Sequence, residues 1–527
     1  MLFNKKKTTM PNKNTDPLFQ LIKSLTKAEK RYFKLHVNKQ TAGEDTKYLK
    51  LFDLIDKQKE FDESKILLKD QSIKSQQLSN LKAHLYKHIL QNLRNLNSNE
   101  DIDLRIRELL DYSTILYNKC LYDQCIKMLD KAKSMAEKYN KNMLLLEITE
   151  FEKRLVTKFI KTNIEDKVSL LIKASDQINE KIKNINTFSN LTIKLYSFYL
   201  KIGFLRNHKD FELVNSFLYS TLPVFQEEQL SFDEKMYLYN SFVGYYSFIQ
   251  DFERGYEYAK KWVNLFDENK TLIVPKIEMY IRSINNLLVS QSKLHKFKEF
   301  KNTVQKLDSI ARTPDLKLTE NINLLLFKYS STHKINKYFM QGEFKEGSEI
   351  IPEIAESLEK YEHLLDTHYI IIFYYKFACM FFGNNDYQNV VHWLNKIINM
   401  KDVDLRSDIH SFARVLNLIS HYELGNIDLV DYYIRSTYRF LIKKNDLHQF
   451  QKIIMKFLRK LSSITRDELI DSFKDLREQL IPLNDKFYER RPFIYFDIIS
   501  WLESKIENRN IQEIIREKAL KKISNNI

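Results

Sequence analysis

The chain has 527 residues, too many for one simple hydrophobic core, which indicates several domains or a repeat array. Glycine and proline occur only eight times each, so the sequence offers few β-turns and favours long helices with short connections. A hydrophobic content of 43% excludes global disorder, and three cysteines cannot form an even disulfide framework, which favours a reducing, cytoplasmic location.

The positive charge of the chain is concentrated near its beginning. Residues 1–50 carry 12 Lys/Arg against 4 Asp/Glu, a surplus of +8 within a net charge of +15. Residues 351–400, with 3 basic and 6 acidic residues, are net −3, so no continuous phosphate-binding stripe follows the chain. The N-terminal surplus keeps open one alternative, a ribosome- or nucleic-acid-associated protein that contacts its target through residues 1–50.

The first hundred residues divide into a lead-in and a helical module. Residues 1–15 are basic and polar with no apolar segment after them, which predicts a disordered lead-in rather than a secretory signal; Met10 is an alternative start. Thr26 and Glu29 have the spacing of a capping box, in which each side chain satisfies a free backbone N–H of the other at a helix start. We therefore predict a helical N-terminal module over residues 16–100.

A repeat array is predicted over residues 101–445 and a helical C-terminal cap over 446–527. The most apolar stretch of the array, Tyr369–Gly383, contains Lys376 and is too short to cross a bilayer, so we expect a buried helix there. In the C-terminal cap, Pro492 is well placed in the first turn of a helix, where its missing N–H costs nothing.

The array is predicted from a recurring pattern in which a bulky residue follows a turn. Small or apolar residues then stand three, seven and ten positions later, as Gly347, Ile351 and Ile354 follow Phe344. On a helix this spacing produces a single apolar stripe. The bulky residues, here called anchors, recur every 40 to 47 residues and define about eight units, with a weaker copy in second place: Tyr122, Ile164, Phe211, Phe252, Phe297, Phe344, Tyr387 and Ile427.

The pattern resembles the turn and second helix of the tetratricopeptide repeat (TPR). The resemblance implies an all-α fold, an α-solenoid of about eight degenerate TPR-like helical hairpins between helical caps. The units exceed the usual 34 or so residues, which predicts longer helices or loops. The segments Lys-Ala-Glu-Lys-Arg-Tyr-Phe-Lys-Leu from Lys27 and Tyr-Phe-Asp-Ile-Ile-Ser-Trp-Leu-Glu-Ser-Lys from Tyr495 resemble helical-repeat proteins of Bacteroidota-type bacteria. The superfamily implies scaffolding, peptide binding or regulation by partner capture.

Local signatures of catalysis are scarce. The scattered glycines form no phosphate-binding loop and no Gly-x-Ser-x-Gly turn. His84 and His88 have the spacing of two metal ligands on one helix, but Leu85 stands where a metalloprotease has its Glu and no third ligand is apparent, so packing histidines are expected. Cys120 and Cys125 are interpreted as small packing residues. We expect a protein that is not an enzyme, with no cofactor and no metal.

The TPR resemblance also indicates where a partner would bind. In that geometry the first helix of each unit lines a concave groove, and Tyr, Asn and Arg side chains there suit an extended peptide, with amides for its backbone and guanidinium groups for its carboxylates. The competing interpretation is packing between units. The two-Lys, two-Asn arrangement by which some family members hold a C-terminal carboxylate is not reproduced. We predict a protein or peptide partner of unknown identity, bound by Tyr196, Tyr199, Arg206, Asn207, Tyr237, Asn240, Arg282, Asn285 and Asn336.

Overall fold

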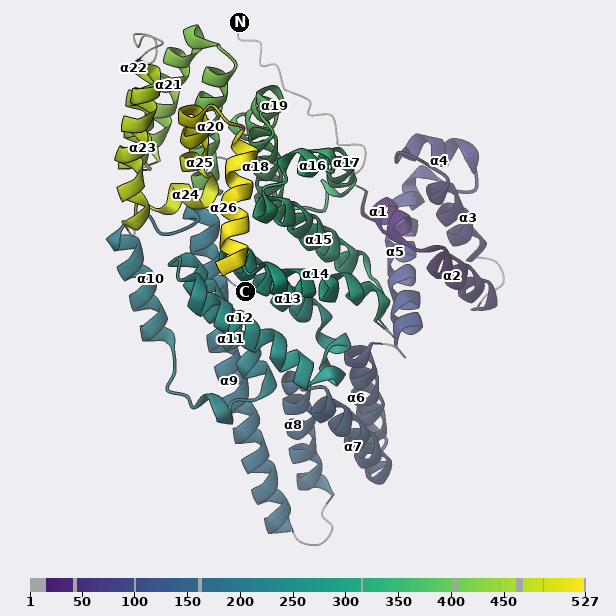
Figure 1. Cartoon of the computed structure of the whole chain (residues 1–527). Coiled ribbons are helices and arrows are strands. Elements are labelled where there is room, and N and C mark those ends of the chain that lie inside the picture. Colours follow the sequence, from purple (N-terminus) through teal and green to yellow (C-terminus); the bar gives the residue numbers. More distant parts are fainter. Residues whose placement is uncertain are drawn as a thin grey trace, which may run out of the picture. The chain divides into compact units, whose positions relative to one another are not determined.

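The fold is all-α, as predicted. The computed structural model describes residues 16–40, 45–98, 101–159, 164–313, 316–400, 405–444, 446–460, 468–486 and 488–525, and every regular element in these ranges is a helix (Figure 1). The predicted lead-in, residues 1–15, lies outside the described residues.

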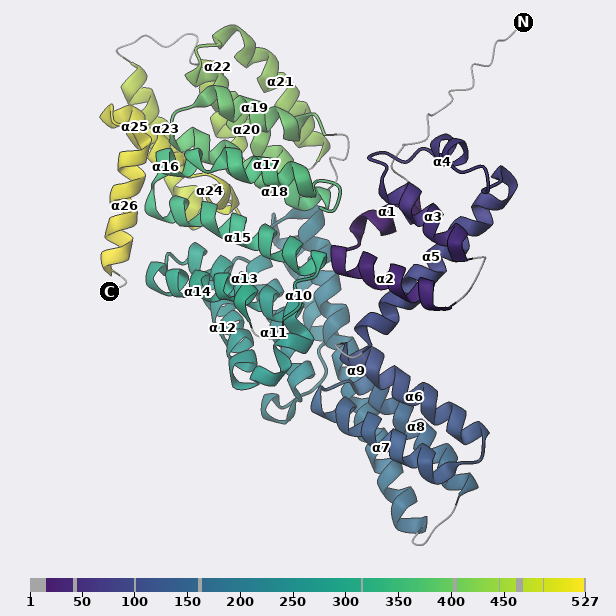
Figure 2. The ribbon, with the colours of Figure 1, turned by 90° about the vertical axis from the view of Figure 1, so that its right-hand side faces the viewer.

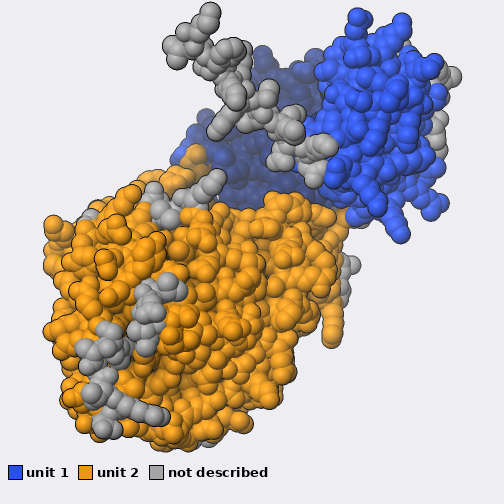
Figure 3. All heavy atoms as spheres, turned by 90° about the horizontal axis from the view of Figure 1, so that it is seen from above, with its two compact units in different colours: residues 1–178 blue, residues 179–527 orange. Residues whose placement is uncertain are grey.

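The chain divides into two compact units, residues 1–178 and 179–527 (Figure 3). Unit 1 begins with five helices that share one apolar core, followed by three helices with a core of their own. The boundary between the units falls inside α9 (Ile164–Ile202). The helices that lie wholly in unit 1 are α1 (Pro17–Ser24), α2 (Lys27–Gln40), α3 (Asp45–Asp56), α4 (Glu63–Lys69), α5 (Ser75–Asn97), α6 (Ile102–Asn118), α7 (Tyr122–Lys138) and α8 (Asn142–Lys158).

The start of α2 confirms the predicted capping box. The Thr26 backbone N–H donates to Glu29 Oε2 at 2.7 Å, and the Glu29 N–H donates to Thr26 Oγ1 at 3.2 Å. The helix therefore begins at Lys27 with two of its free N–H groups satisfied. This fixes α2 so that Phe33 packs against Phe52 of α3, with ring centroids 5.0 Å apart.

In unit 2 helices that follow one another along the chain pack together, as α11 does with α12, α13 with α14, α18 with α19 and α20 with α21, so these helices form hairpins (Figures 1 and 2). The first helices of the hairpins, α13, α15, α18 and α20, also contact one another in that order. The helices are α10 (His208–Thr221), α11 (Phe232–Phe248), α12 (Phe252–Glu268), α13 (Ile277–Lys293), α14 (Phe297–Ser309), α15 (Glu320–Gln341), α16 (Phe344–Glu349), α17 (Ile351–Tyr361), α18 (Thr367–Gly383), α19 (Tyr387–Ile398), α20 (Ser407–Glu423) and α21 (Ile427–Lys443).

The predicted anchors stand at the starts of second helices. Phe252, Phe297, Phe344 and Tyr387 are the first residues of α12, α14, α16 and α19. In α12 the predicted stripe is confirmed, since Gly255, Ala259 and Trp262 are all buried. Trp262 is fully buried, and removal of so large a core side chain costs about 3–5 kcal/mol of folding free energy.

One turn geometry joins the helices of six hairpins. The residue two positions before each anchor has a left-handed backbone, with φ between 53° and 73°, and the N–H of the next residue donates to the carbonyl five positions earlier at 2.9–3.0 Å. This combination is the Schellman motif, which satisfies carbonyl groups that a helix end leaves free. Only two of the six left-handed residues are glycines; the set is Cys120, Gln250, His295, Gly342, Asn385 and Gly425.

The second predicted unit differs from this pattern. Its anchor Ile164 is the first residue of α9, but α9 runs for 39 residues without a turn, to Ile202. No glycine or proline occurs between these two positions, and Gly203, with φ of 71°, is the first residue that ends the helix. One helix therefore replaces the second helix of one unit and the first helix of the next.

The C-terminal helices pack against the repeat array, where α26 contacts α15. Gly342, at the turn after α15, lies so close to α26 that a Cβ there would stand 2.7 Å from the Arg516 backbone nitrogen. Pro492 occupies the first turn of α24, as predicted. This region comprises α22 (Gln449–Lys460), α23 (Leu469–Asp485), α24 (Arg491–Tyr495), α25 (Ile498–Glu507) and α26 (Ile511–Asn525), and α23 and α25 share one large apolar core with α18 to α21.

Candidate functional site

Polar side chains from successive first helices meet on one face of unit 2. We call this set the polar face: Tyr196 of α9, Tyr237 of α11, Arg282, Asn285 and Lys293 of α13, Lys328, His333 and Asn336 of α15, and Lys376 of α18. Arg282 acts electrostatically on both Tyr196 and Tyr237, which places the end of α9 near the first halves of α11 and α13. Tyr196, Arg282 and Lys293 are exposed, so the face is accessible to a partner.

His333 is the centre of a hydrogen-bonded chain that crosses three helices. Its Nε2 lies 3.0 Å from Asn285 Oδ1, its Nδ1 lies 3.2 Å from Asn336 Nδ2, and Asn336 Oδ1 accepts from Lys376 Nζ at 2.5 Å. One ring nitrogen therefore donates and the other accepts, which requires a neutral imidazole. Burial and then the nearby Lys376 lower the pKa of His333 to about 3, in agreement with this role.

Two lysines occupy one end of the polar face. Lys293 is exposed at its surface but has protein on most sides, and this desolvation, followed by repulsion from Lys376, lowers its pKa to about 7. Burial likewise lowers the pKa of Lys376 to about 8. The Lys293 ammonium donates to the Ile494 carbonyl at 3.3 Å, a neutral acceptor. Two positive charges therefore stand close together in surroundings that disfavour charge.

Arg282 and Lys328 lie at the other end, among tyrosines. Lys328 Nζ stands 3.4 Å from the centroid of the Tyr369 ring, a cation–π contact. Burial lowers the pKa of Lys328 to about 8; Asp366 acts in the opposite direction, and Arg282 lowers the pKa further. Burial, with a contribution from Asp366, raises the pKa of Tyr196 to about 12. These tyrosines are therefore neutral hydrogen-bonding groups at physiological pH.

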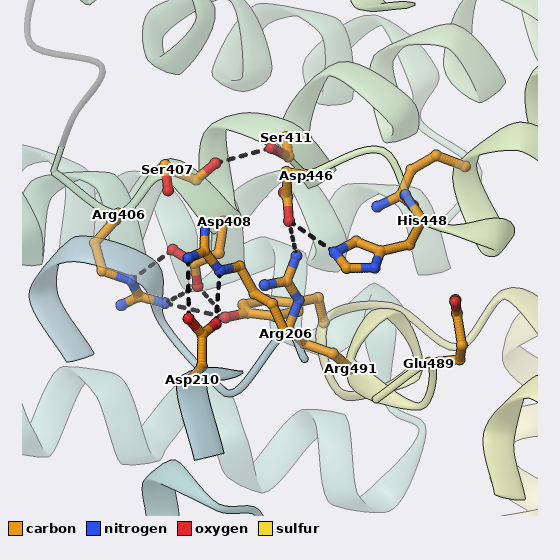
Figure 4. A network of polar contacts seen from close by, with 12 residues as sticks. Arg206, Asp210, Arg406, Ser407, Asp408, Ser411, Asp446, His448, Glu489 and Arg491 are labelled. Carbon is orange, nitrogen blue, oxygen red and sulfur yellow. Dashed lines mark hydrogen bonds and ion pairs between the residues drawn. The ribbon is translucent and has the colours of Figure 1, made fainter. Parts of the chain in front are cut away.

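A buried ion pair joins the end of α9 to the start of α20. We call it the α9–α20 junction: Tyr199, Gly203, His368, Arg406, Asp408 and Tyr495 (Figure 4 shows the Arg406–Asp408 pair). Arg406 donates to both carboxylate oxygens of Asp408, at 2.9 and 2.8 Å, and to the Tyr199 hydroxyl at 3.2 Å. Its backbone N–H donates to the Leu200 carbonyl at 2.8 Å. The hairpins that follow α9 along the chain thus contact α9 again at the start of α20.

The junction holds unusual backbone conformations. Arg406 has φ of 53° and is 2% exposed, although left-handed backbone is uncommon for a side chain of this size. Gly203 faces it, and a Cβ at Gly203 would stand 1.9 Å from Asp408 Oδ2. Burial acts to raise the pKa of Asp408, but the Arg406 guanidinium and the Tyr495 hydroxyl hold it below its usual value. Asp408 is therefore ionised and fully paired.

A second buried pair lies beside the junction in Figure 4, between Arg491 and Asp446. The Asp446 carboxylate also stands 3.3 Å from His448 Nε2. Burial acts to raise the pKa of Asp446, and Arg491 together with hydrogen bonds holds it at about 2. This pair attaches α24 to the end of α21, so it serves the fold.

The predicted partner-binding residues fall into four groups. Tyr196, Tyr237, Arg282, Asn285 and Asn336 come together on the polar face. Tyr199 belongs to the α9–α20 junction, where it lies 4.7 Å below the Arg406 guanidinium. Arg206 and Asn207 lie beyond the end of α9 and bond to Asp210, Arg206 as an ion pair at 2.9 Å and Asn207 as the N-cap of α10. Asn240 is a half-buried residue of α11.

Sequence reasoning missed the lysines and histidines of this region. Lys293, Lys328, His333 and His368 carry no motif, and only their place on first helices could have nominated them. Lys376 did carry a signal, because a lone lysine in the most apolar helix of the chain must either hydrogen-bond to another residue or reach solvent. It does both, bonding to Asn336 while staying half-buried.

The other candidates from the sequence, the histidine pair His84 and His88 and the thiol of Cys125, take part in packing. The rings of His84 and His88 both pack near Tyr48, with centroids 6.5 and 5.7 Å apart. The Cys125 thiol donates to the Ser113 carbonyl at 3.3 Å inside the core. Among the described residues, no three His, Cys, Asp or Glu side chains gather as a metal site would require.

No described helix combines the length and the apolar character that a bilayer crossing needs. Comparison with known proteins assigns no family and no function to the chain. No protein-family model matches it, and no curated protein is detectably similar to it.

Proposed function

We propose that the protein is a non-enzymatic interaction protein of the cytoplasm, a scaffold or regulator that holds a protein or peptide segment against the polar face. In this proposal the described helix hairpins form a TPR-like solenoid of about eight units, and the polar face is its concave groove. The observation that carries the proposal is the convergence of Tyr196, Tyr237, Arg282 and Asn285 from three successive first helices, with Tyr196 and Arg282 exposed.

The chemistry of the face suits a peptide. Neutral tyrosine hydroxyls and asparagine amides can donate to and accept from a peptide backbone, and guanidinium and ammonium groups can pair with carboxylates. Exposed aromatic and arginine side chains also dominate the binding energy of many protein interfaces. None of the hydroxyl groups of the face has a free imidazole beside it as a base, because the nearest one, His333, is already bonded on both nitrogens.

The alternative, a ribosome- or nucleic-acid-associated protein, would use the basic N-terminal module. Several lysines of that module are neutralised internally. Lys30 pairs with Asp56 at 2.7 Å, and Lys82 pairs with Asp16 at 2.5 Å. This reduces the charge available to phosphates, so we give the polar face priority.

A photo-crosslinking experiment in the cell of origin tests the proposal. p-Benzoylphenylalanine is placed at position 196 on the polar face or, as the control, at position 432, where Tyr432 of α21 is 64% exposed. We expect a protein crosslink at position 196 that Arg282→Ala abolishes and nuclease treatment does not. Equal crosslinking at both positions, or a product that needs nucleic acid, would contradict the proposal.

A further inference from the structure

Four cations of the polar face lack a carboxylate partner. Within the described part of the chain, no Asp or Glu lies at ion-pair distance from Arg282, Lys293, Lys328 or Lys376. The Lys293 ammonium contacts a carbonyl, that of Lys376 an amide and that of Lys328 an aromatic ring. Lys293 and Lys376 moreover repel each other. A folded chain does not gain stability by placing like charges together in a poorly solvated place, so the arrangement needs another explanation.

Three lysines in or next to α12, α13 and α14 do have carboxylate partners. Lys276, immediately before α13, pairs with Asp233 at 2.8 Å, and Lys306 of α14 pairs with Asp267 at 2.5 Å. Lys261 of α12 pairs with Glu227 at 3.0 Å. Carboxylates thus neutralise these three cations, whereas the four polar-face cations have none at ion-pair distance.

The four cations form two groups along parallel first helices. Arg282 and Lys293 are eleven residues apart on α13, which corresponds to about 16 Å along the helix axis. Lys328 accompanies Arg282, and Lys376 accompanies Lys293. An extended chain covers about 16 Å in roughly five residues. Two negative groups five residues apart on an extended peptide would therefore reach both groups at once.

We propose that the occupant of the polar face is an acidic, extended protein segment, whose carboxylates pair with Lys293 and Lys376 at one end and with Arg282 and Lys328 at the other. This inference rests on the proposed function and names the chemistry of the partner. Binding would supply the missing counter-charges, so the segment would be recognised by charge at its two ends, by the Tyr196 and Tyr237 side chains beside Arg282, and by Asn285 between the ends.

A nucleic acid fits the face less well. Its phosphates form a continuous negative line, whereas Asp366 stands close enough to Lys328 and Tyr196 to act on both electrostatically. A fixed carboxylate beside the cations would repel every phosphate that follows the groove. A peptide can instead place a neutral or basic residue opposite Asp366, and even in an all-glutamate peptide the flexible side chain can turn away from Asp366, which a backbone phosphate cannot do.

Fluorescence anisotropy with the full-length protein tests the inference. The probes are fluorescein-labelled decaglutamate, decaglutamine and a ten-nucleotide oligothymidylate at low salt. We expect decaglutamate to bind, decaglutamine to bind at least tenfold more weakly, and the double variant Lys293→Met/Lys376→Met to lose at least tenfold in affinity for decaglutamate. The matched control, Lys298→Met/Lys301→Met, removes two exposed lysines of α14 and should retain the affinity.

A pair of spaced peptides tests the two-ended arrangement. A neutral decapeptide with glutamates at its positions 3 and 8 should bind several-fold more tightly than one with glutamates at positions 5 and 6. Equal affinity for decaglutamate and decaglutamine, tighter binding of the oligonucleotide, or equal losses in both double variants would overturn the inference. A crosslinked partner at position 196 that binds regardless of Lys293 and Lys376 would leave the proposed function intact while rejecting its acidic partner.

Discussion

The α9–α20 junction and the polar face are built from the same kinds of residue and use them in opposite ways. At the junction, Arg406 is buried and its guanidinium donates to the Asp408 carboxylate and to the Tyr199 hydroxyl. On the polar face, Lys293 is exposed and its nearest charged neighbour is another lysine. Paired, enclosed charges fix the fold, whereas unpaired, accessible charges are available to a partner, and mutations should separate the two roles.

The largest expected effect comes from breaking the junction. Arg406→Met leaves the Asp408 carboxylate buried without a counter-charge, which should cost about 3–5 kcal/mol of unfolding free energy. Replacing both residues, as Arg406→Met/Asp408→Leu, should cost less because no charge remains to be desolvated. Urea denaturation at pH 7 measures both. A double variant as unstable as the single one would mean that the pair matters for its shape and not for its charge.

A second test compares two glycines with nearly equal backbone angles. Gly203 at the junction has φ of 71° and Gly425 at an ordinary turn has φ of 73°. Gly425→Ala meets no atom within 4 Å and should cost only about 1 kcal/mol, the cost of left-handed backbone. Gly203→Ala would place its Cβ against Asp408 and should cost at least twice as much. Thermal melts compare the two; equal costs would show that the junction can relax.

The two regions should also share one response to acid. Burial and then a nearby cation lower the pKa of both His333 on the polar face and His368 at the junction to about 3. The unfolded chain binds these protons near pH 6.5, so the contribution of the two histidines to stability should be constant above that pH and fall as the pH drops from 6.5 toward 3. At pH 5 each histidine should account for about 2 kcal/mol.

Urea denaturation between pH 7 and pH 4 measures this loss, and the variants His333→Asn and His368→Asn isolate its two sources. Each should be less stable at pH 7 and should lose less between pH 7 and pH 5 than the wild-type protein. If either variant loses as much stability between pH 7 and pH 5 as the wild-type protein, the corresponding histidine is protonated in the folded state without loss of stability.

The smallest effect is expected from the lysines. Lys293→Met and Lys376→Met each remove a charge that its surroundings disfavour and that the other lysine repels, so stability should rise, by no more than about 1 kcal/mol. Urea denaturation alongside the junction variants makes the comparison. A loss of more than about 2 kcal/mol would show that Lys376 is needed by Asn336 and His333, and that the polar face serves the fold.

The sequence predicted the positions of the second helices well because their signal is local. A bulky anchor and an apolar stripe at three, seven and ten residues can be read without knowledge of any neighbour, and Phe252, Phe297 and Tyr387 each begin a helix as expected. The continuity of α9 was missed because Ile164 has a similar, weaker spacing, and the absence of a turn former after it was not weighed. The turns were predicted, but their left-handed residues were not, because Gln250 and His295 adopt a backbone usually left to glycine.

The candidate site was predictable only by analogy. Assigning first helices to a groove nominated Tyr196, Tyr237, Arg282, Asn285 and Asn336, which do meet. The same analogy could not show that the Tyr199 hydroxyl accepts a hydrogen bond from Arg406, more than 200 residues away along the chain. Such pairings depend on how the hairpins stack, and no residue near Tyr199 records where α20 will lie.

The contact between Leu200 and Arg406 also limits how the chain can have changed over time. An array with a free end can gain or lose a hairpin by duplication or deletion, because each unit touches only its neighbours. Here the helix at residue 200 must meet the one at residue 406 with a backbone hydrogen bond of 2.8 Å. A hairpin inserted or removed between them would carry the two ends apart. The number of units between α9 and α20 is therefore fixed by closure, and length variation is confined to the segments on either side.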